Sequence, residues 1–275
     1  MRTWTFFKGH GTANDFVIVR DRHALLSPTP EDIRFICDRR RGIGGDGFLR
    51  VTKAGHFPEW DGDPDLWFMD FRNADGSIAE MCGNGARVFA RYLIQENLAS
   101  GDQLDIATRA GLVHAVLERD GRITVTLGQP TRRSRPTLIH ACGRDWPAHV
   151  VAVGNPHAVV WLSSQAELEA IDLRQPELPV ADYPEGGNTE FVCLFDETHL
   201  GLRVWERGVG ETQSCGTGMV AAAFDHLSLT GDGAGSVRVT APGGSLDVRV
   251  DQAGVAHLTG PAVIVGRGNV FLPCE

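Results

Sequence analysis

The 275-residue sequence has no long apolar run. No stretch approaches the ~20 apolar residues that a membrane-spanning helix needs. The first residues, Met1–Lys8, lack the apolar centre of a secretory signal peptide. We therefore expect a cytoplasmic protein with no membrane partner. Low-complexity tracts and flexible linkers are also missing. A length of 275 residues suits one large domain or two of ordinary size.

Clustered positive charge is equally scarce. There are 26 Lys and Arg residues against 35 Asp and Glu residues, so the formal net charge is −9. The short groups Arg39–Arg41 and Arg132–Arg133 are isolated, and we interpret both as solvated surface. This pattern gives no indication of nucleic acid as a partner, although an acidic protein can still bind an anionic small molecule at a local site.

The six cysteines form no Cys-x-x-Cys pair, which argues against a zinc knuckle and a thioredoxin motif. In a reducing compartment we expect free thiols. Most buried cysteines behave as small hydrophobic residues, and this is our interpretation of Cys37, Cys142, Cys193 and Cys274.

Several familiar motifs fail when their context is considered. Gly42–Gly47 matches G-x-G-x-x-G, but it follows a helix expected at Pro30–Arg41 rather than a strand. Asp61–Asp65 resembles a calcium loop, but the glycine at its sixth place and the glutamate at its twelfth are missing. In a Cys-x5-Arg phosphatase loop, Val88 would stand where arginine should be. With no metal-ligand cluster and no lysine beside a cofactor loop, we expect no cofactor.

The most informative stretch that is present is Glu206–Ala223, which reads ERGVGETQSCGTGMVAAA. Glycines beside Cys215 let the backbone approach a ligand closely. The apolar run Met219–Phe224 predicts a buried helix, so Cys215 should lie at its N-terminus. Free N–H groups and the helix dipole stabilise negative charge there, and a cysteine so placed can act as a thiolate.

A weaker copy of this unit occurs earlier in the chain. Met81–Gly85 reads MCGNG and precedes an amphipathic helix predicted at Ala86–Gln95. The polar turn Phe71–Ser77 takes the place that Trp205–Glu211 holds in the second copy. A single Cys-Gly-x-Gly turn is usually structural, but two matching copies indicate two related halves that each present one cysteine at a helix N-terminus.

The rest of the chain alternates with period two between short turns, for example over Gln103–Leu127. Thr131–Pro136 is the candidate crossing between the halves. The predicted fold class is α+β, with two pseudo-symmetric and mostly antiparallel β domains, each wrapped around a central helix.

Asparagines gather on glycine-rich loops, and an acidic and a basic residue lie beside the second cysteine motif: Asn14, Asn73, Asn84, Asn155, Asn188, Glu206 and Arg207. Neutral amides with one arginine suit a zwitterionic amino acid. Two thiols on opposite sides of one carbon could remove a proton from one face and return one to the other. Helix N-termini aimed at the adjacent carboxylate would stabilise the charge that develops.

His157 leaves two interpretations open. It could be a loop histidine with satisfied hydrogen bonds, or it could tune the pKa of a nearby thiol.

With these motifs the sequence resembles the diaminopimelate epimerase family over nearly its whole length. The segments that carry the resemblance are Lys8–Gly11 with Asn14–Phe16, Gly42–Gly47, Asn73–Ser77, Met81–Arg87, Gly154–His157, Gly187–Asn188, Glu206–Gly208, Cys215–Gly218 and Leu258–Ala262.

The resemblance implies a cofactor-independent interconversion of LL- and meso-diaminopimelate, on the route to lysine and peptidoglycan. It also implies a homodimer, two β domains with the site in the cleft between them, and a last strand that returns to the first domain. We accordingly expect an N-terminal half of residues 1–130 plus 266–275 carrying Cys82. The C-terminal half, residues 131–265, carries Cys215.

Site roles follow from the matching positions. The resemblance makes Cys82 and Cys215 the acid/base thiols, and it places His157 and Glu206 beside them as groups that modulate their pKa. The reacting carboxylate would be held by Gly83, Asn84, Gly216 and Thr217, and the rest of the substrate by Asn14, Asn73, Asn155, Asn188, Glu206 and Arg207. One position departs from part of the family, since Gly47 stands where some members have glutamine.

Two alternatives remain. A proline or hydroxyproline racemase of the same fold could also use two cysteines, but it has no use for a second amino-acid clamp such as Arg207. A ligand-binding or redox-sensing protein could instead join Cys82 and Cys215 in a disulfide under oxidation.

Overall fold

The structure is a computed structural model that describes residues 2–273. Contacts between residues divide the chain into two compact units. Unit 1 comprises Met1–Val125 and Gly260–Glu275, and unit 2 comprises Thr126–Thr259. Within the described residues, no helix is both long and apolar enough to cross a lipid bilayer.

The unit boundaries fall a few residues before those expected from the sequence, which were residues 130 and 265. They lie inside β7 (Ile123–Thr126) and β17 (Ala256–Gly260). The cause is local hydrogen bonding: the N–H of Leu127 donates to the carbonyl of Ala256, and the N–H of Ala256 donates to Gly128. These bonds attach the residues before the predicted crossing segment to unit 2.

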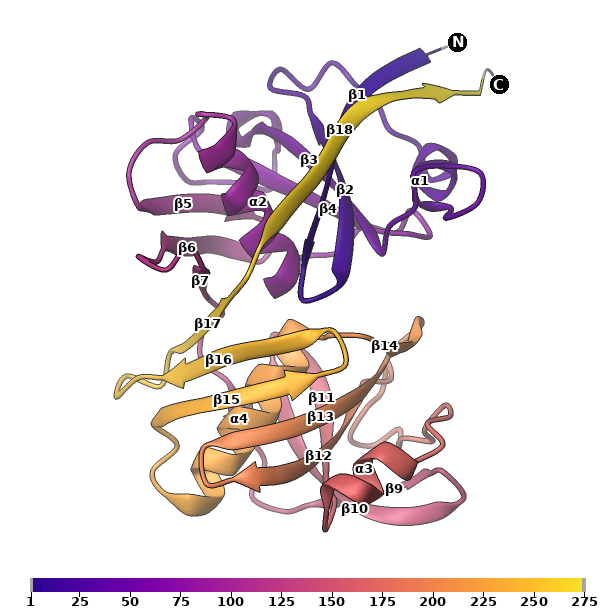
Figure 1. Ribbon diagram of the computed structural model, residues 1–275, viewed down its shortest axis with the longest axis vertical. Coiled ribbons are helices and arrows are strands. Elements are labelled where there is room, and N and C mark those ends of the chain that lie inside the picture. The colour runs from indigo at the N-terminus through magenta and orange to yellow at the C-terminus, as the bar shows by residue number, and fades with distance from the viewer. Residues whose placement is uncertain (1, 274–275) are drawn as a thin grey trace. The chain divides into compact units, whose positions relative to one another are not determined.

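The strands of unit 1 pair in an alternating pattern. β1–β2, β3–β4 and β5–β6 are antiparallel pairs, and the parallel pairs β2–β3 and β4–β5 connect them. The C-terminal strand runs antiparallel beside β1 and is drawn in yellow in Figure 1. The strands are β1 (Arg2–Gly11), β2 (Asn14–Arg20), β3 (Gly47–Lys53), β4 (Trp67–Asn73), β5 (Gln103–Thr108), β6 (Gly111–Leu117) and β18 (Val263–Leu272).

Unit 2 repeats this pattern. β10–β11, β12–β13 and β15–β16 are antiparallel, and β11–β12 and β13–β15 are parallel. The strands are β8 (Thr131–Arg132), β9 (Thr137–Ala141), β10 (Arg144–Val153), β11 (Asn155–Trp161), β12 (Asn188–Asp196), β13 (His199–Glu206), β14 (Gly210–Thr212), β15 (Gly235–Ala241) and β16 (Gly244–Val250). The same strand order in both units confirms the prediction of two pseudo-symmetric, mostly antiparallel α+β halves.

Each unit has one central helix, α2 (Gly83–Gln95) or α4 (Gly216–Thr230) (Figure 1). The predicted apolar face of α2 is buried against the strands of unit 1, and Tyr92 meets Phe7 edge-on with ring centroids 4.9 Å apart. In α4 the consecutive residues Met219–Ala223 are all buried. A helix that is apolar on all sides belongs in the centre of a core, so α4 is fixed firmly within unit 2.

Short helices precede β3 and β12 in the two units. α1 (Pro30–Cys37) starts at the predicted N-cap Thr29, where Thr29 and Asp32 form a reciprocal capping box. It ends four residues earlier than the predicted Arg41, because the Asp38 carboxylate accepts the N–H groups of Arg40 and Arg41 and turns the chain. The counterpart in unit 2 is α3 (Gln165–Ala170), and a 3-10 turn, η1 (Ala54–His56), follows β3.

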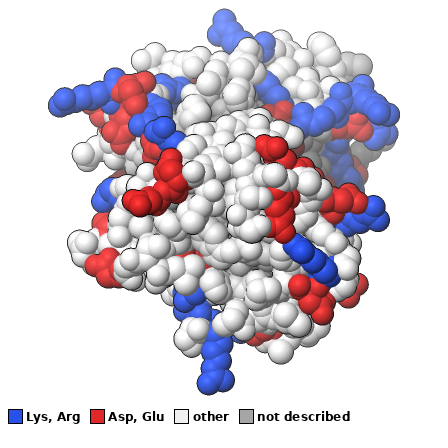
Figure 2. All heavy atoms as spheres, turned by 60° about the horizontal axis from the view of Figure 1, so that its bottom comes forward, with Lys and Arg blue, Asp and Glu red and all other residues white. Residues whose placement is uncertain are grey.

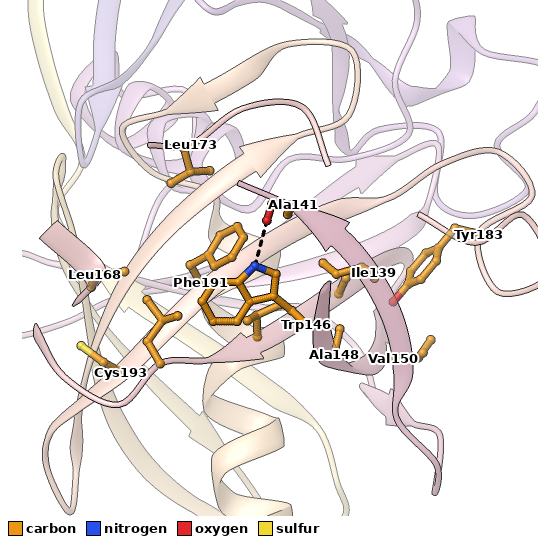
Figure 3. Packing of buried hydrophobic residues seen from close by; sticks show 13 residues of the cluster. Ile139, Ala141, Trp146, Ala148, Val150, Leu168, Leu173, Tyr183, Phe191 and Cys193 are labelled. Carbon is orange, nitrogen blue, oxygen red and sulfur yellow. Dashed lines mark hydrogen bonds between the residues drawn. The ribbon is translucent and has the colours of Figure 1, made fainter. Parts of the chain in front are cut away.

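One hydrophobic cluster of unit 2 packs on the face of β12 that carries Phe191 and Cys193. Figure 3 shows Trp146 beside Phe191, and their ring centroids lie 5.8 Å apart in an edge-on arrangement. The indole N–H of Trp146 donates to the carbonyl of Ala141 at 2.9 Å, so its burial leaves no lost hydrogen bond. Since side chains alternate along a strand, Glu190 faces away from this cluster. Burying a side chain such as Phe191 contributes about 1.5–3 kcal/mol, which fixes the register of β12.

Candidate active site

Cys82 is the N-cap residue of α2, with extended backbone angles, as predicted. Its sulfur accepts the N–H of Gly85 at 3.4 Å and lies 3.8 Å from the side-chain oxygen of Asn14. The first N–H groups of a helix have no partner within it, so Gly83 and Asn84 are placed where an anion would be stabilised. We call Cys82, Asn14, Asn84 and Arg87 the Cys82 group.

The Cys82 group contains a buried positive charge that sequence reasoning did not single out. Arg87 is fully buried one turn into α2, and it donates to the side-chain oxygens of Asn84 at 2.9 Å and Thr12 at 3.3 Å. In the described part of the chain no carboxylate pairs with it. Burial lowers the pKa of Arg87 to about 10, so it stays charged at neutral pH, and a thiolate at Cys82 would be attracted to it. The sequence did offer one indication of this charge: Arg87 follows Gly83 by four residues, which is about one helical turn.

Asn14 is held by an ion network at the start of β2. Its amide nitrogen donates to Asp46 at 2.9 Å, while its oxygen accepts from Asn84 at 3.2 Å. Asp15 is bound by Lys8 and by both terminal nitrogens of Arg39. Partial burial opposes ionisation of Asp15, but the bonds from Arg39 and Lys8 outweigh it and hold the pKa of Asp15 well below its usual range. Sequence reasoning missed this network because Arg39 is 24 positions from Asp15 and Asp46 is 32 positions from Asn14.

Asn73 lies at the end of β4 opposite Gly47 on β3. Its amide donates to the hydroxyl of Ser77 at 3.0 Å and so closes the polar turn predicted there. A Cβ at Gly47 would lie 2.7 Å from the ring of Phe71 and 3.0 Å from the carbonyl of Arg72. A side chain at position 47 therefore does not fit unless Phe71 moves.

Cys215 is the N-cap residue of α4, as predicted, and is only 6% exposed. Its sulfur accepts from the amide nitrogen of Asn188 at 3.7 Å and lies 3.5 Å from the hydroxyl of Thr217. Burial raises the pKa of Cys215 well above its usual value, and the charges of Glu206 and Glu190 raise it further. We call Cys215, Asn188, Glu206 and Glu190 the Cys215 group.

Loop residues around Cys215 are held in place by Asn188 and Glu206. The side-chain oxygen of Asn188 accepts the backbone N–H of Arg207 at 2.9 Å, which leaves its nitrogen for Cys215. Glu206 accepts from the hydroxyl of Thr212, and burial raises its pKa. Arg207 is exposed and donates one guanidinium N–H to the carbonyl of Glu185, so its other N–H groups face solvent.

His157 is fully buried on β11 rather than lying in a loop. Its two ring nitrogens lie 2.7 Å from a carboxylate oxygen of Glu190 and 2.9 Å from the side-chain oxygen of Asn155. Glu190 was not predicted, because Asn188–Glu190 was interpreted as a polar loop. An acidic residue directly before the apolar residues of a strand was the missed signal.

The other thiols in the described part of the chain take no part in either group. Cys37 and Cys193 are buried, as interpreted from the sequence, and burial raises the pKa of both. Cys142 is half-buried and packs against the hydrophobic cluster that contains Trp146 and Phe191, and Cys274 lies outside the described residues. Among residues 2–273 no three His, Cys, Asp or Glu side chains are grouped so that they could hold a metal ion.

Comparison with known proteins shows which family the chain is similar to. A model of the family described as "Diaminopimelate epimerase" matches residues 6–133 and 149–265. The chain is 45% identical to the diaminopimelate epimerase of Corynebacterium glutamicum over 98% of both chains. It is 43% identical to that of Streptomyces coelicolor, over 96% of this chain and 94% of the relative.

Solved structures share the fold at lower identity. A probable proline racemase from Agrobacterium radiobacter aligns with a TM-score of 0.72 at 16% identity, over 98% of this chain and 93% of that one. A Bacillus anthracis phenazine biosynthesis protein of the PhzF family aligns with a TM-score of 0.71 at 16% identity, over 99% and 100%. The match to the family model and the identities above 40% along nearly the whole chain decide its membership: the chain belongs to the diaminopimelate epimerase family.

Proposed function

We propose that this protein is a diaminopimelate epimerase, an isomerase that interconverts LL- and meso-2,6-diaminopimelate without a cofactor. Identities of 41–45% to diaminopimelate epimerases along nearly the whole chain support the substrate. One observation carries the chemistry: each unit presents a single cysteine as the N-cap of its central helix.

The reaction proceeds by two proton transfers at one Cα. In one direction the Cys82 thiolate takes the Cα proton and becomes a thiol, while the Cys215 thiol gives its proton to the opposite face and becomes a thiolate. The electron pair left on Cα is delocalised into the adjacent carboxylate, which the helix N-termini at Gly83–Asn84 and Gly216–Thr217 stabilise. The reverse direction exchanges the two roles, so atoms and charges balance.

The surroundings of the thiols support this starting state. Arg87 and the N–H of Gly85 favour a thiolate at Cys82. Burial and the carboxylates of Glu206 and Glu190 favour a thiol at Cys215. A two-thiol mechanism requires one group in each state.

The remaining site residues bind the substrate. Arg207, with its exposed guanidinium, is assigned to the distal carboxylate, since arginine pairs with carboxylates in a bidentate manner. Neutral amides and one carboxylate complete the contacts to the amino-acid groups: Asn14, Asn73, Asn155, Asn188 and Glu206.

The wider setting is also part of the proposal. The enzyme would act in the cytoplasm as a homodimer, in the formation of lysine and peptidoglycan precursors, with an amino acid rather than nucleic acid as its ligand. On the face in Figure 2, Lys and Arg side chains are interspersed with Asp and Glu side chains, a distribution that is consistent with a small-molecule partner.

Solvent exchange tests the function. The protein is incubated in deuterated buffer with fresh reductant and LL-diaminopimelate, meso-diaminopimelate or proline, and deuterium at Cα is measured by NMR. We expect deuterium in both diaminopimelate isomers, none in proline, and no epimerisation by Cys215→Ala. Exchange of proline alone would indicate a proline racemase. A lack of exchange in all three would leave the redox-sensing alternative, which predicts a reversible disulfide between Cys82 and Cys215.

A further inference from the structure

Glu190 is a fully buried carboxylate that neither gives nor takes a proton in the proposed reaction. It lies on the face of β12 opposite Phe191, against the first turn of α4. A Cβ at Gly218 would lie only 2.6 Å from its Oε1 atom. The second glycine of the Cys215–Gly218 motif therefore makes room for this carboxylate. The positive end of the α4 dipole favours a negative charge there.

His157 faces oxygen atoms on both sides of its ring. Nδ1 lies 2.7 Å from Oε1 of Glu190 and Nε2 lies 2.9 Å from Oδ1 of Asn155. A carboxylate oxygen and an amide oxygen accept hydrogen bonds and cannot donate them. Each ring nitrogen of His157 therefore faces an oxygen to which an N–H group would donate. A buried imidazolium is costly unless it is paired, and Glu190 lies where it would supply the paired charge.

The same chain of contacts sets the orientation of Asn155. Its oxygen is occupied by His157, so its NH₂ group points the other way, and it makes no hydrogen bond to the described residues. Asn155 is half-buried, so this group can meet a ligand. With a neutral His157 whose Nε2 accepts, the amide would reverse and present its oxygen instead.

We propose that Glu190 is a positioning residue of the epimerase: through the His157 imidazolium it holds Asn155 with its NH₂ group presented to a carboxylate of the substrate. This inference rests on the proposed function for the identity of the ligand. The other titratable groups near the pair are Glu206, Cys215 and Tyr183, whose hydroxyl donates to the carbonyl of His157 at 3.2 Å. The Glu190–His157 pair has no net charge, so its loss should affect substrate binding more than proton transfer at Cys215.

The first test observes His157 directly and does not need activity. Protein with ¹⁵N-labelled histidine is examined by NMR at pH 7, and His157→Gln assigns the signal. We expect two protonated ring nitrogens in the wild type and a neutral ring in Glu190→Gln. A neutral His157 in the wild type would overturn the proposal even if the enzyme epimerises diaminopimelate.

Kinetics form the second test. Glu190→Gln should raise KM for diaminopimelate about tenfold, the usual effect of one lost hydrogen bond to a charged group, with a smaller change in kcat. Glu167→Gln, which removes a surface carboxylate of the same unit, should change neither. An unchanged KM in Glu190→Gln would refute the positioning role.

Asn155→Asp separates the two ends of the amide. It keeps an oxygen for Nε2 of His157 but removes the NH₂ group, so the imidazolium signal should persist while KM rises. A normal KM in this variant would contradict the proposed contact.

Gly218→Ala is a second test of the pairing if Glu190→Gln does not fold. The added Cβ would displace the carboxylate of Glu190, so the imidazolium signal of His157 should weaken. An unchanged signal in Gly218→Ala would count against the pairing.

Discussion

Cys82 and Cys215 both precede the first residue of a central helix, yet the charged groups around them have opposite sign. Near Cys82 the buried charge is the guanidinium of Arg87. Near Cys215 the nearest buried carboxylate is that of Glu206, and Glu190 adds a second carboxylate that is paired with His157. The backbone of the two units repeats the same strand order, so the repeat provides two equivalent helix N-termini and the side chains make them unequal.

This difference suits a two-base reaction. Two identical thiol sites would ionise together, and the enzyme would then hold either two bases or two acids. The opposite surroundings favour the proposed starting state, with a thiolate at Cys82 and a thiol at Cys215. Single substitutions can alter one of the two sites at a time.

Removal of either thiol has the largest expected effect. Cys82→Ala and Cys215→Ala should each lower the epimerisation rate by at least about 10²–10⁴-fold, the usual contribution of a general acid or base. The measurement is the interconversion of LL- and meso-diaminopimelate followed by chiral chromatography. Cys142→Ser, which changes a cysteine in a turn, should leave the rate unchanged. Appreciable epimerisation by either alanine variant would refute the two-thiol mechanism.

Replacement of Arg87 should make the Cys82 site resemble the Cys215 site. In Arg87→Met the thiolate loses its buried cation, so alkylation of Cys82 should need a pH about one to two units higher. Turnover at pH 7 should fall about ten- to a hundredfold. Arg91→Met on the same helix removes a guanidinium that binds only carbonyl oxygens, and it serves as the control. An equal effect of the two substitutions would mean that Arg87 acts only through packing.

Replacement of Glu206 should shift Cys215 in the opposite direction. Glu206→Gln removes a negative charge, so the pKa of Cys215 should fall by about one unit. Alkylation of Cys215 as a function of pH measures this shift, and Glu211→Gln, a surface carboxylate nearby, is the control. An unchanged or higher pKa of Cys215 in Glu206→Gln would contradict this effect of the Glu206 charge.

Asp15 gives the smallest effect and concerns stability. Its pKa in the folded protein lies below the unfolded value of about 3.9. Its contribution is therefore present above that pH and is lost as the pH falls toward the folded pKa. Asp15→Asn should cost about 1–2 kcal/mol at pH 7, and the difference from wild type should shrink below about pH 4. Urea unfolding at several pH values measures it; a constant difference would contradict the ionic origin, and Asp61→Asn should show no effect.

The sequence predicted the features that local pattern controls. Period-two alternation and turns gave the strands, and the Cys-Gly-x-Gly units placed Cys82 and Cys215 as N-caps. Contacts between segments that are distant in the chain could not be predicted from the sequence. The contact between Glu190 and His157 could not be predicted, because the two residues are 33 positions apart and lie side by side only through the parallel pairing of β11 with β12. The influence of the Arg87 charge on Cys82 was not predicted, because it depends on the burial of Arg87, which the local sequence does not show.

The most direct test of the unequal thiols is alkylation by iodoacetamide as a function of pH, with Cys82 and Cys215 followed separately by peptide mass spectrometry. Each rate is normalised to its own maximum, so that the deeper burial of Cys215 does not bias the comparison. We predict that Cys82 reaches half its maximal rate at a clearly lower pH than Cys215. Coincident profiles, or the reverse order, would contradict it.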